Sequence, residues 1–407
     1  MNKRINILCT LMTMFVYLFM QFGMFGTNNS LHVSAAANDQ IAGKFMPPNG
    51  KSLFFIGQDE DACLKYTQSG LFQMPSGMTT YINLYTLEGL QGNIGYNGGS
   101  SISMLWSKLL DRLLKAFCYK FGTGPSNTQK IIEKHQTSVI AIGVYMTELN
   151  NSDGLDKITK GVYDKQIDEL AKVIRNANRP VYLRLGYEAE GIWNNYDPIK
   201  YKAAWQYIVN RMRPQASNFV SVWQCATSPY NERNRNNIND WYPGDDFVDW
   251  CGFSYFLPGK QDDLSNALLN FARHHNKPVL ICESTPQSYD INKLTQGYVD
   301  FQGTKDTALI TKAKMPNQIW EEWFKPYFQY IHDNSDVIRG VAYINQNWDS
   351  QSFWGYPYKN GYWGDTRIQQ NSAIVKLWNE ELDSDYWLKG SATLFSQLGW
   401  QTILSSD

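Results

Sequence analysis

The sequence has few of the residues that metal and Ser-His chemistry require. Its 407 residues include five histidines, and the four that follow the N-terminal segment form no HxH or HExxH spacing. They are His135, His274, His275 and His332. A GxSxG elbow is also missing. Zinc hydrolysis and catalysis by a Ser-His triad are therefore both disfavoured.

Cysteine is sparse as well, and basic charge is not in excess. After the N-terminal segment the number of cysteines is odd, they are widely spaced, and no two form a CxxC motif. This pattern fits neither a disulfide framework nor a zinc site. They are Cys63, Cys118, Cys225, Cys251 and Cys282. Cys225, Cys251 and Cys282 lie in apolar, strand-like runs and are predicted to be buried thiols. The formal net charge is −1 without a basic run, so nucleic acid is not an expected partner.

Only the N-terminus carries a long apolar run. Two positive charges within residues 1–4 precede an apolar stretch from Ile5 to Phe25, and Ala35-Ala36-Ala37 offers an A-x-A cleavage site. This pattern predicts a signal peptide over residues 1–37 and a secreted, extracellular protein. An uncleaved anchor is the alternative, because about 20 apolar residues can span a bilayer. We expect no membrane association after cleavage, and a monomer.

Apolar runs alternate with helical patterns along the rest of the chain. The predicted strands are Leu53 to Gly57, Thr79 to Tyr85, Val139 to Tyr145, Val181 to Leu185, Phe219 to Gln224, Trp250 to Tyr255, Val279 to Cys282 and Ile338 to Ile344. Helical spacing over Leu105 to Phe117 and Tyr163 to Ile174, and Asp197-Pro198 as a helix start, predict helices between them. Eight such units describe an α/β fold, a (β/α)8 barrel. It is expected over residues 53–387, with an N-terminal approach segment over 38–52 and a C-terminal extension over 388–407.

Two of these runs begin with proline and end on a carboxylate. RPVYLRLGYEAEG carries Glu188 and KPVLICES carries Glu283. Period-2 alternation predicts Tyr182, Arg184, Gly186 and Glu188 on one face of the fourth strand, and Val279, Ile281 and Glu283 on one face of the seventh. Three βα units of about 32 residues separate the two acids, close to the roughly 31 of a 250-residue barrel. Paired carboxylate chemistry at one end of a barrel is therefore indicated.

The same residues resemble glycoside hydrolase family 26, whose better-known members are β-mannanases, with relatives acting on β-1,3-xylan and mixed-linkage β-glucan. RPVYLRLGYEAEGIW resembles the family's acid/base strand, and KPVLICES resembles its nucleophile strand. WYPGDDFVDWCGFSYF resembles the approach to the sixth strand, and GVAYINQNWD with WGDTRIQ resembles the closing strand and loop. The resemblance covers roughly residues 53–382, with four motifs in order.

The resemblance implies a role for each matching residue. Glu188 matches the general acid/base, Glu283 the nucleophile and Arg184 the arginine of the fourth strand, which is expected to bind substrate. Tyr255 matches a tyrosine that holds the nucleophile, and Trp193 and Trp348 match aromatics that line the sugar site. Tyr187 stands where mannanases of the family usually place His, and by strand parity it touches substrate only if the strand end twists. Trp223 is predicted to be either a sugar subsite or packing.

Retaining hydrolysis of a glycosidic bond needs these two acids in opposite charge states. One protonates the departing oxygen while the other, about 5 to 5.5 Å away, attacks the anomeric carbon. An ionised Glu283 and burial against aromatics would keep Glu188 protonated, while Tyr255 and Arg184 would keep Glu283 charged. No metal or organic cofactor is required.

The prediction from sequence is a secreted, retaining endo-β-glycanase acting on a polysaccharide or oligosaccharide. β-1,4-Mannan ranks first as substrate, with β-1,3-xylan close behind and mixed-linkage β-glucan as a further alternative. A non-catalytic sugar-binding barrel is the alternative from another functional class. Glu190, two residues after Glu188, is the main competitor for the acid, and a loop contact is its more ordinary role.

Overall fold

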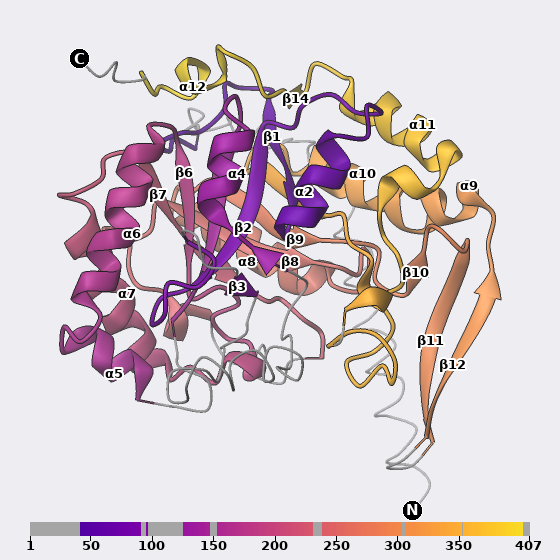
Figure 1. The fold of residues 1–407 in the computed structure, drawn as a ribbon, viewed down its shortest axis with the longest axis horizontal. Helices are drawn as coiled ribbons and strands as arrows, with labels where there is room; N and C mark the ends of the chain where they lie inside the picture. Colours follow the sequence, from indigo (N-terminus) through magenta and orange to yellow (C-terminus); the bar gives the residue numbers. More distant parts are fainter. Residues whose placement is uncertain are drawn as a thin grey trace, which may run out of the picture. The chain divides into compact units, whose positions relative to one another are not determined.

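Eight parallel strands close into a barrel in this computed structural model, which describes residues 41–90, 95–96, 125–146, 153–230, 238–302, 306–351 and 353–401. Neighbouring strands pair in chain order, and the last pairs with the first, which closes the ring (Figure 1). The barrel strands are β1 (Ser52–Gly57), β2 (Gly77–Asn83), β5 (Val139–Tyr145), β6 (Val181–Leu185), β7 (Phe219–Cys225), β8 (Trp250–Tyr255), β9 (Val279–Ser284) and β13 (Ile338–Ile344). The predicted (β/α)8 fold is confirmed. Each predicted strand overlaps one strand of the barrel, and the second begins at Gly77 instead of Thr79.

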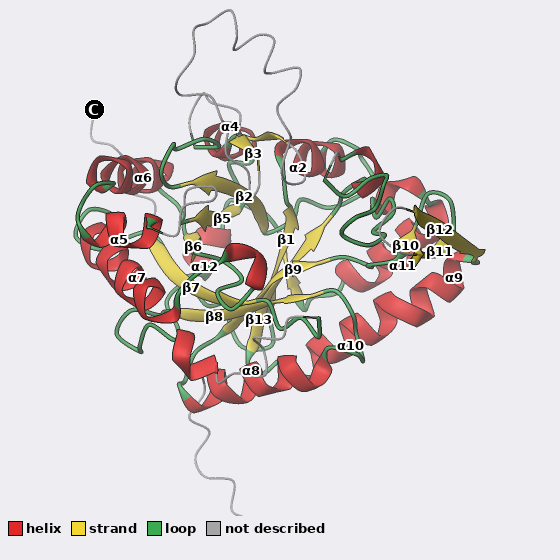
Figure 2. Cartoon of the chain, turned by 90° about the horizontal axis from the view of Figure 1, so that it is seen from below, coloured by secondary structure: helices red, strands yellow, loops and turns green. Residues whose placement is uncertain are grey.

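Helices surround the strands, and Figure 2 shows this ring around the central barrel. They are α2 (Glu60–Thr67), α4 (Thr128–Lys134), α5 (Gly154–Thr159), α6 (Asp164–Ala177), α7 (Pro198–Met212), α8 (Asp262–His274), α9 (Pro316–Ile319), α10 (Lys325–Asp333), α11 (Ser372–Leu382) and α12 (Leu394–Gln397). The predicted cap of α7 is confirmed, since Asp197 accepts hydrogen bonds from the backbone amides of Ile199 and Lys200. The helix expected over Leu105 to Phe117 lies outside the described residues, as do Cys118 and the segment predicted as a signal peptide.

Strand alternation sorts the side chains into two cores. Inward positions such as Phe55, Tyr182 and Val222 fill the barrel, and outward positions such as Ile142 and Leu183 pack beneath the helices. Most of these strands are buried on both faces and therefore appear as continuous apolar runs in the sequence.

Both segments flanking the predicted barrel domain pack against the N-terminal ends of its strands. Phe45 and the C-terminal residues Leu394 and Leu398 join the core inside the barrel. The hydroxyl of Tyr182 donates to the carbonyl of Phe45 at 2.5 Å. Strand β14 (Trp387–Leu388) pairs with the start of β1. This end of the barrel is filled by apolar side chains, so the opposite end carries the polar groups.

The long connection after β9 contains strands that the sequence did not suggest. β10 (Tyr289–Asp290), β11 (Thr295–Gln302) and β12 (Asp306–Ala313) form a small antiparallel sheet, which Figure 1 shows outside the barrel beside α9. The short elements of the other connections are β3 (Gly95–Tyr96), β4 (Pro125–Ser126), the 3-10 turns η1 (Ile192–Asn194), η3 (Ile238–Trp241), η5 (Trp348–Ser350) and η6 (Ile368–Gln370), and the π-helical turn η4 (Trp320–Phe324).

The predicted state of the strand cysteines is confirmed. Cys225, Cys251 and Cys282 are buried with free thiols, as is Cys63 of α2. Among the described residues, the structure has no helix that is both long and apolar enough to cross a membrane.

Candidate active site

Glu283 enters the site through a break in the alternation of β9. Ile281 pairs with Phe253 but Glu283 pairs with Ser254, so Cys282 is an extra residue in the strand. Val279 and Ile281 lie in the core beneath the helices, whereas Leu280 and Cys282 lie inside the barrel. The prediction that Val279 and Ile281 share a face with Glu283 was therefore wrong. The bulge turns Glu283 inward, a common device beside active sites.

Three donors converge on one carboxylate oxygen of Glu283. Its Oε1 accepts hydrogen bonds from the Tyr81 hydroxyl at 2.8 Å, from Arg184 Nη2 at 2.5 Å and from Gln224 Nε2 at 3.3 Å. Arg184 is fully buried on the inward face of β6. Its burial keeps Arg184 from reaching substrate, so the prediction that it binds substrate was wrong; its contact is with Glu283, which it was expected to keep charged. Among the described residues, none donates a hydrogen bond to Oε2 of Glu283.

Glu188 lies just beyond the end of β6, where the chain leaves the extended conformation. Gly186 has φ +50°, and a Cβ there would lie 2.6 Å from Met146 Cε and 2.7 Å from Tyr201 Cε2. Glu188 itself has φ +52°, a conformation that is uncommon for non-glycine residues. The side-chain amide of Asn194 donates to the carbonyls of Tyr187 and Glu188 at 2.9 and 3.0 Å. These bonds hold the turn that presents Glu188.

The carboxyl group of Glu188 is held at both oxygens. Ser254 Oγ donates to Oε1 at 2.7 Å and the indole N–H of Trp193 donates to Oε2 at 2.7 Å. Burial and the nearby charge of Glu283 raise the pKa of Glu188 to about 8, although both donors act in the opposite direction. Glu188 therefore keeps its proton at neutral pH, as a general acid must.

Two residues that the sequence analysis did not single out connect the carboxyl groups. The Gln224 amide accepts from Arg184 Nε at 2.9 Å and donates to Ser254 Oγ at 3.0 Å, besides its bond to Glu283. Gln224 follows the inward residues Val220 and Val222 of β7, and Ser254 follows the inward Trp250 of β8. Strand parity was the signal that marks both, and Tyr81 of β2 could have been found in the same way.

Parity also corrects two predicted substrate contacts. Trp223 and Tyr255 lie on the outward faces of β7 and β8 and are fully buried. Trp223 packs against Tyr242 and Phe271. The hydroxyl of Tyr255 donates to Asp262 at 2.6 Å, so the prediction that Tyr255 holds Glu283 was wrong. Tyr81 makes that contact from the opposite side of the barrel.

The remaining predicted aromatic residues differ in how far they are exposed for contact with a sugar. Trp193 is 50% exposed and lies directly on Glu188. Tyr187 does turn inward at the twisted strand end, where its ring packs edge-on against Tyr81. Trp348 is only 2% exposed and packs on Trp354 and Trp363, so its burial opposes direct contact with a sugar. Trp348 instead packs within the connection that follows β13.

Glu190 is not placed to serve as the acid. It is almost fully buried and accepts hydrogen bonds from the backbone amides of Ala226 and Thr227, both at 2.9 Å. Its carboxylate thus satisfies the amides just beyond β7, the loop contact that its place in the sequence suggested.

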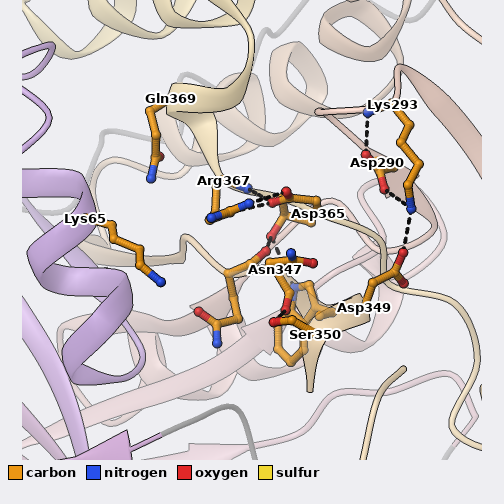
Figure 3. Close-up of polar contacts among 12 residues, drawn as sticks. Lys65, Asp290, Lys293, Asn347, Asp349, Ser350, Asp365, Arg367 and Gln369 are labelled. Atoms are coloured by element: carbon orange, nitrogen blue, oxygen red, sulfur yellow. Dashed lines mark hydrogen bonds and ion pairs between the residues drawn. The ribbon is translucent and has the colours of Figure 1, made fainter. Parts of the chain in front are cut away.

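A second polar cluster joins the connections after β9 and β13. Lys293 Nζ lies 3.2 Å from Asp290 Oδ2 and 2.7 Å from Asp349 Oδ2, and Arg367 pairs with Asp365 at 2.6 Å (Figure 3). These acids are therefore matched by cations from the same segments. In the part of the chain that the structure describes, no group of three or more His, Cys, Asp or Glu side chains is arranged to hold a metal ion.

Comparison with known proteins agrees with this geometry. Residues 126–309 match the model of glycosyl hydrolase family 26. A protein named beta-1,3-xylanase TXYA from a Vibrio species is 35% identical over 370 residues, covering 88% of this chain and 70% of that protein. The chain belongs to glycoside hydrolase family 26. A beta-1,3-xylanase from an Alcaligenes species is 33% identical over 380 residues, covering 91% of this chain and 71% of that protein.

Solved structures of family 26 share the fold at low sequence identity. An endo-beta-1,4-mannanase from Cellulomonas fimi aligns with a TM-score of 0.53 and 14% identity, covering 87% of this chain and 75% of that one. The catalytic domain of an endo-beta-1,4-mannanase from Bacillus sp. JAMB-750 aligns with a TM-score of 0.51 and 14% identity, covering 86% and 90%. These likenesses establish the family's barrel but do not discriminate among its substrates.

Proposed function

We propose that this glycoside hydrolase is a retaining endo-β-glycosidase that cleaves β-1,3-xylan, with Glu188 as acid/base and Glu283 as nucleophile. The contrast between the two carboxyl environments carries the proposal. Glu283 receives three donors on one oxygen, including a buried guanidinium, and such charge-assisted hydrogen bonds orient a carboxylate. The raised pKa of Glu188 favours its protonated form. Opposite charge states at one pH are what double displacement requires.

In the first step, Oε2 of Glu283 attacks the anomeric carbon while Glu188 transfers its proton to the departing glycosidic oxygen. The C–O bond to the leaving group breaks and a glycosyl ester of Glu283 forms. The negative charge of Glu283 disappears with ester formation, which removes one cause of the raised pKa of Glu188. Glu188 then takes a proton from water as that water attacks the same carbon, which restores both side chains.

The distribution of exposed aromatic side chains supports a polymeric substrate. In the described residues, the large aromatic side chains that are exposed all lie in connections that follow the C-terminal ends of barrel strands. They are Trp193, Tyr230, Tyr298, Phe301, Phe353 and Tyr356. Aromatic faces stack on the apolar faces of sugar rings, and this is the end of a barrel at which active sites occur. Contacts on several connections suit binding along a chain, and hence internal cleavage.

The choice of β-1,3-xylan rests on the relatives. The two curated relatives named beta-1,3-xylanase cover most of this chain at 33–35% identity, whereas the mannanase structures share 14%. Tyr187 also occupies the position at which family mannanases usually carry His. These observations favour β-1,3-xylan, which the sequence ranked second, over β-1,4-mannan.

A panel digest tests the substrate. β-1,3-Xylan, β-1,4-mannan, glucomannan and lichenan are incubated separately with the enzyme, and the products are sized. We expect β-1,3-xylo-oligosaccharides of several lengths early in the digest. Release of only the shortest product would indicate action from a chain end, faster digestion of mannan would restore the alternative, and binding without product would support a sugar-binding barrel.

Two substitutions test the assigned roles. Glu188→Gln should abolish hydrolysis of the polysaccharide but retain attack on aryl glycosides whose leaving group needs no proton. Glu283→Ala should be inactive and should regain turnover of such aryl glycosides with azide as external nucleophile. Unchanged hydrolysis of xylan by either variant would contradict the corresponding role.

We further propose that the enzyme is secreted, on the strength of the charged, apolar and A-x-A pattern of its first 37 residues. We also propose that it is a monomer, as expected from the sequence analysis. Expression in a secreting host should yield extracellular protein whose N-terminal sequence begins at Asn38, with a monomer mass in light scattering. Retention in the cell membrane would support the anchor, and a dimer mass would contradict the monomer.

A further inference from the structure

The hydrogen bonds between Glu283 and Glu188 have a direction that chemistry fixes. Arg184 can only donate, so Gln224 must turn its carbonyl oxygen toward Arg184 Nε. The amide nitrogen of Gln224 then faces both Glu283 Oε1, at 3.3 Å, and Ser254 Oγ, at 3.0 Å. Because Ser254 accepts from Gln224, its own hydroxyl proton is directed to Glu188 Oε1 at 2.7 Å. From Arg184 through Gln224 and Ser254, each group donates toward Glu188, and Gln224 uses its second N–H for Glu283.

Burial makes this direction persistent. Gln224, Ser254 and Arg184 are all fully buried, so water does not compete for their hydrogen bonds. Turning the Gln224 amide over would set its NH2 group against the donor Nε of Arg184, so the orientation of Gln224 is fixed.

We propose that Gln224 and Ser254 are positioning residues, forming a one-way link through which the charge on Glu283 sets the strength of the hydrogen bond that Glu188 receives. The inference rests on the proposed roles of the two carboxyl groups and adds residues that act through them. Neither Gln224 nor Ser254 need touch the reacting atoms.

The link changes at the step where Glu188 must change its role. While Glu283 is ionised, the Gln224 amide nitrogen is shared between Glu283 and Ser254. Formation of the glycosyl ester makes Oε1 of Glu283 a weaker, uncharged acceptor, so Gln224 bonds more strongly to Ser254. A hydroxyl that accepts a stronger hydrogen bond is itself a better donor. Ser254 then stabilises ionised Glu188, the form needed for the second step.

The other groups that act on the proton affinity of Glu188 do not substitute for this link. Glu283 and Glu190 both favour its protonated form, while Trp193 favours its ionised form from the solvent side. Glu190 is fixed by the amides of Ala226 and Thr227, and Arg184 is bonded to Glu283. Among these groups, the Ser254 hydroxyl alone connects Glu188 to Glu283 through hydrogen bonds.

The test isolates hydrolysis of the glycosyl-enzyme. The substrate is a 2,4-dinitrophenyl β-1,3-xylobioside, whose leaving group departs without a proton. A burst of dinitrophenolate then shows that hydrolysis of the glycosyl-enzyme, the second step, limits kcat. The acid limb of kcat against pH then reports ionisation of Glu188 in the intermediate. Ser254→Ala should move this limb upward by about one pH unit, because a hydrogen bond to the charged form is lost.

Two further variants keep the outcome decisive. Gln224→Met fills similar space without donors and should shift the limb in the same direction. Ser254→Cys, whose thiol is a weak donor, should give an intermediate shift. Ser221→Ala is the matched control, because Ser221 lies on the same barrel but bonds Phe247 and Asp249 on the outer side. The acid limb of kcat against pH should not move in Ser221→Ala.

An unmoved limb in folded Ser254→Ala or, if that variant does not fold, in Ser254→Cys, would overturn the link. The proposed function fails in a different way. If Glu188→Gln leaves the acid limb in place, the acid/base assignment itself is wrong. If that limb vanishes in Glu188→Gln but stays fixed in every Ser254 and Gln224 variant, only the link is wrong.

Discussion

Tyr81 donates a 2.8 Å hydrogen bond to Oε1 of Glu283, although 202 residues separate the two along the chain. Its hydroxyl oxygen accepts from Arg184 Nη2 at 2.9 Å, which directs its proton to the carboxylate. Barrel closure brings β2, β6 and β9 to this point. Glu283, the proposed nucleophile, is thus oriented by a tyrosine and an arginine that approach from different strands.

Replacing Tyr81 by Phe should lower kcat/KM by about 10- to 100-fold, because a hydrogen bond to a charged group contributes roughly 1.5–3 kcal/mol. The ring stays, so the packing with Tyr187 should survive. Tyr207→Phe is the matched control, since it removes a tyrosine bond to Asp164 among the outer helices. Kinetics on β-1,3-xylan check the expectation, and equal rates for both variants would contradict it.

Gly143 of β5 makes the room that Tyr81 occupies. A Cβ at this position would lie 2.5 Å from Tyr81 Cδ1 and 3.3 Å from Tyr187 Cδ1. Gly143→Ala should therefore push the Tyr81 ring away from Glu283 and reduce activity at least as much as Tyr81→Phe. Gly340→Ala, whose nearest contact is the end of the Leu280 side chain at 3.0 Å, serves as the control. Full activity of Gly143→Ala would show that the position of the ring is unimportant.

Removal of Arg184 should affect folding as well as catalysis. Arg184→Met leaves the Glu283 carboxylate buried without its cation, and breaking a buried pair typically costs about 3–5 kcal/mol. Chemical denaturation measures the change in unfolding free energy. Arg211→Met breaks a partly exposed pair with Asp164 and Asp168, and should cost no more than about 1 kcal/mol. Similar losses for both variants would contradict the importance of the buried pair.

The raised pKa of Glu188 predicts an alkaline limit to activity. Burial and the charge of Glu283 raise this pKa to about 8, so the acid form is present below that pH and is lost above it. The kcat/KM for xylan should fall as pH rises through about 8. Trp193→Phe removes a donor that lowers the pKa, so its alkaline limb should move upward. A limb that stays in place in this variant would argue against the indole contact.

Most of the barrel could be predicted from the sequence because its strands are buried on both faces, which leaves unbroken apolar runs between helical patterns. The Asp197-Pro198 helix start was predictable for a local reason, the capping of backbone amides by one side chain. The sheet formed by β10, β11 and β12 was missed because it lies within the long connection after β9, where polar and apolar residues are mixed.

The site was predictable to the extent that it follows strand parity. Parity placed Arg184 on the inward face with Glu188 but did not show that it would be too deeply buried to bind substrate. Parity from Val220 and Trp250 would have pointed to Gln224 and Ser254. Tyr255 was assigned from the family resemblance, and Trp223 was considered as a sugar subsite. Strand parity would have placed both side chains on the outward face of the barrel. The orientation of Glu283 depends on the bulge at Cys282, and that of Glu188 on a turn with positive φ. Neither feature follows from a period-2 pattern.

The most direct measurement is covalent capture of the nucleophile. A 2-deoxy-2-fluoro glycoside of β-1,3-xylobiose with a dinitrophenyl leaving group should inactivate the enzyme by accumulating the glycosyl ester. Peptide mass spectrometry should place one label on Glu283, and none should appear in Glu283→Ala. A label on another residue, or turnover of xylan with inversion at the anomeric carbon, would contradict the account.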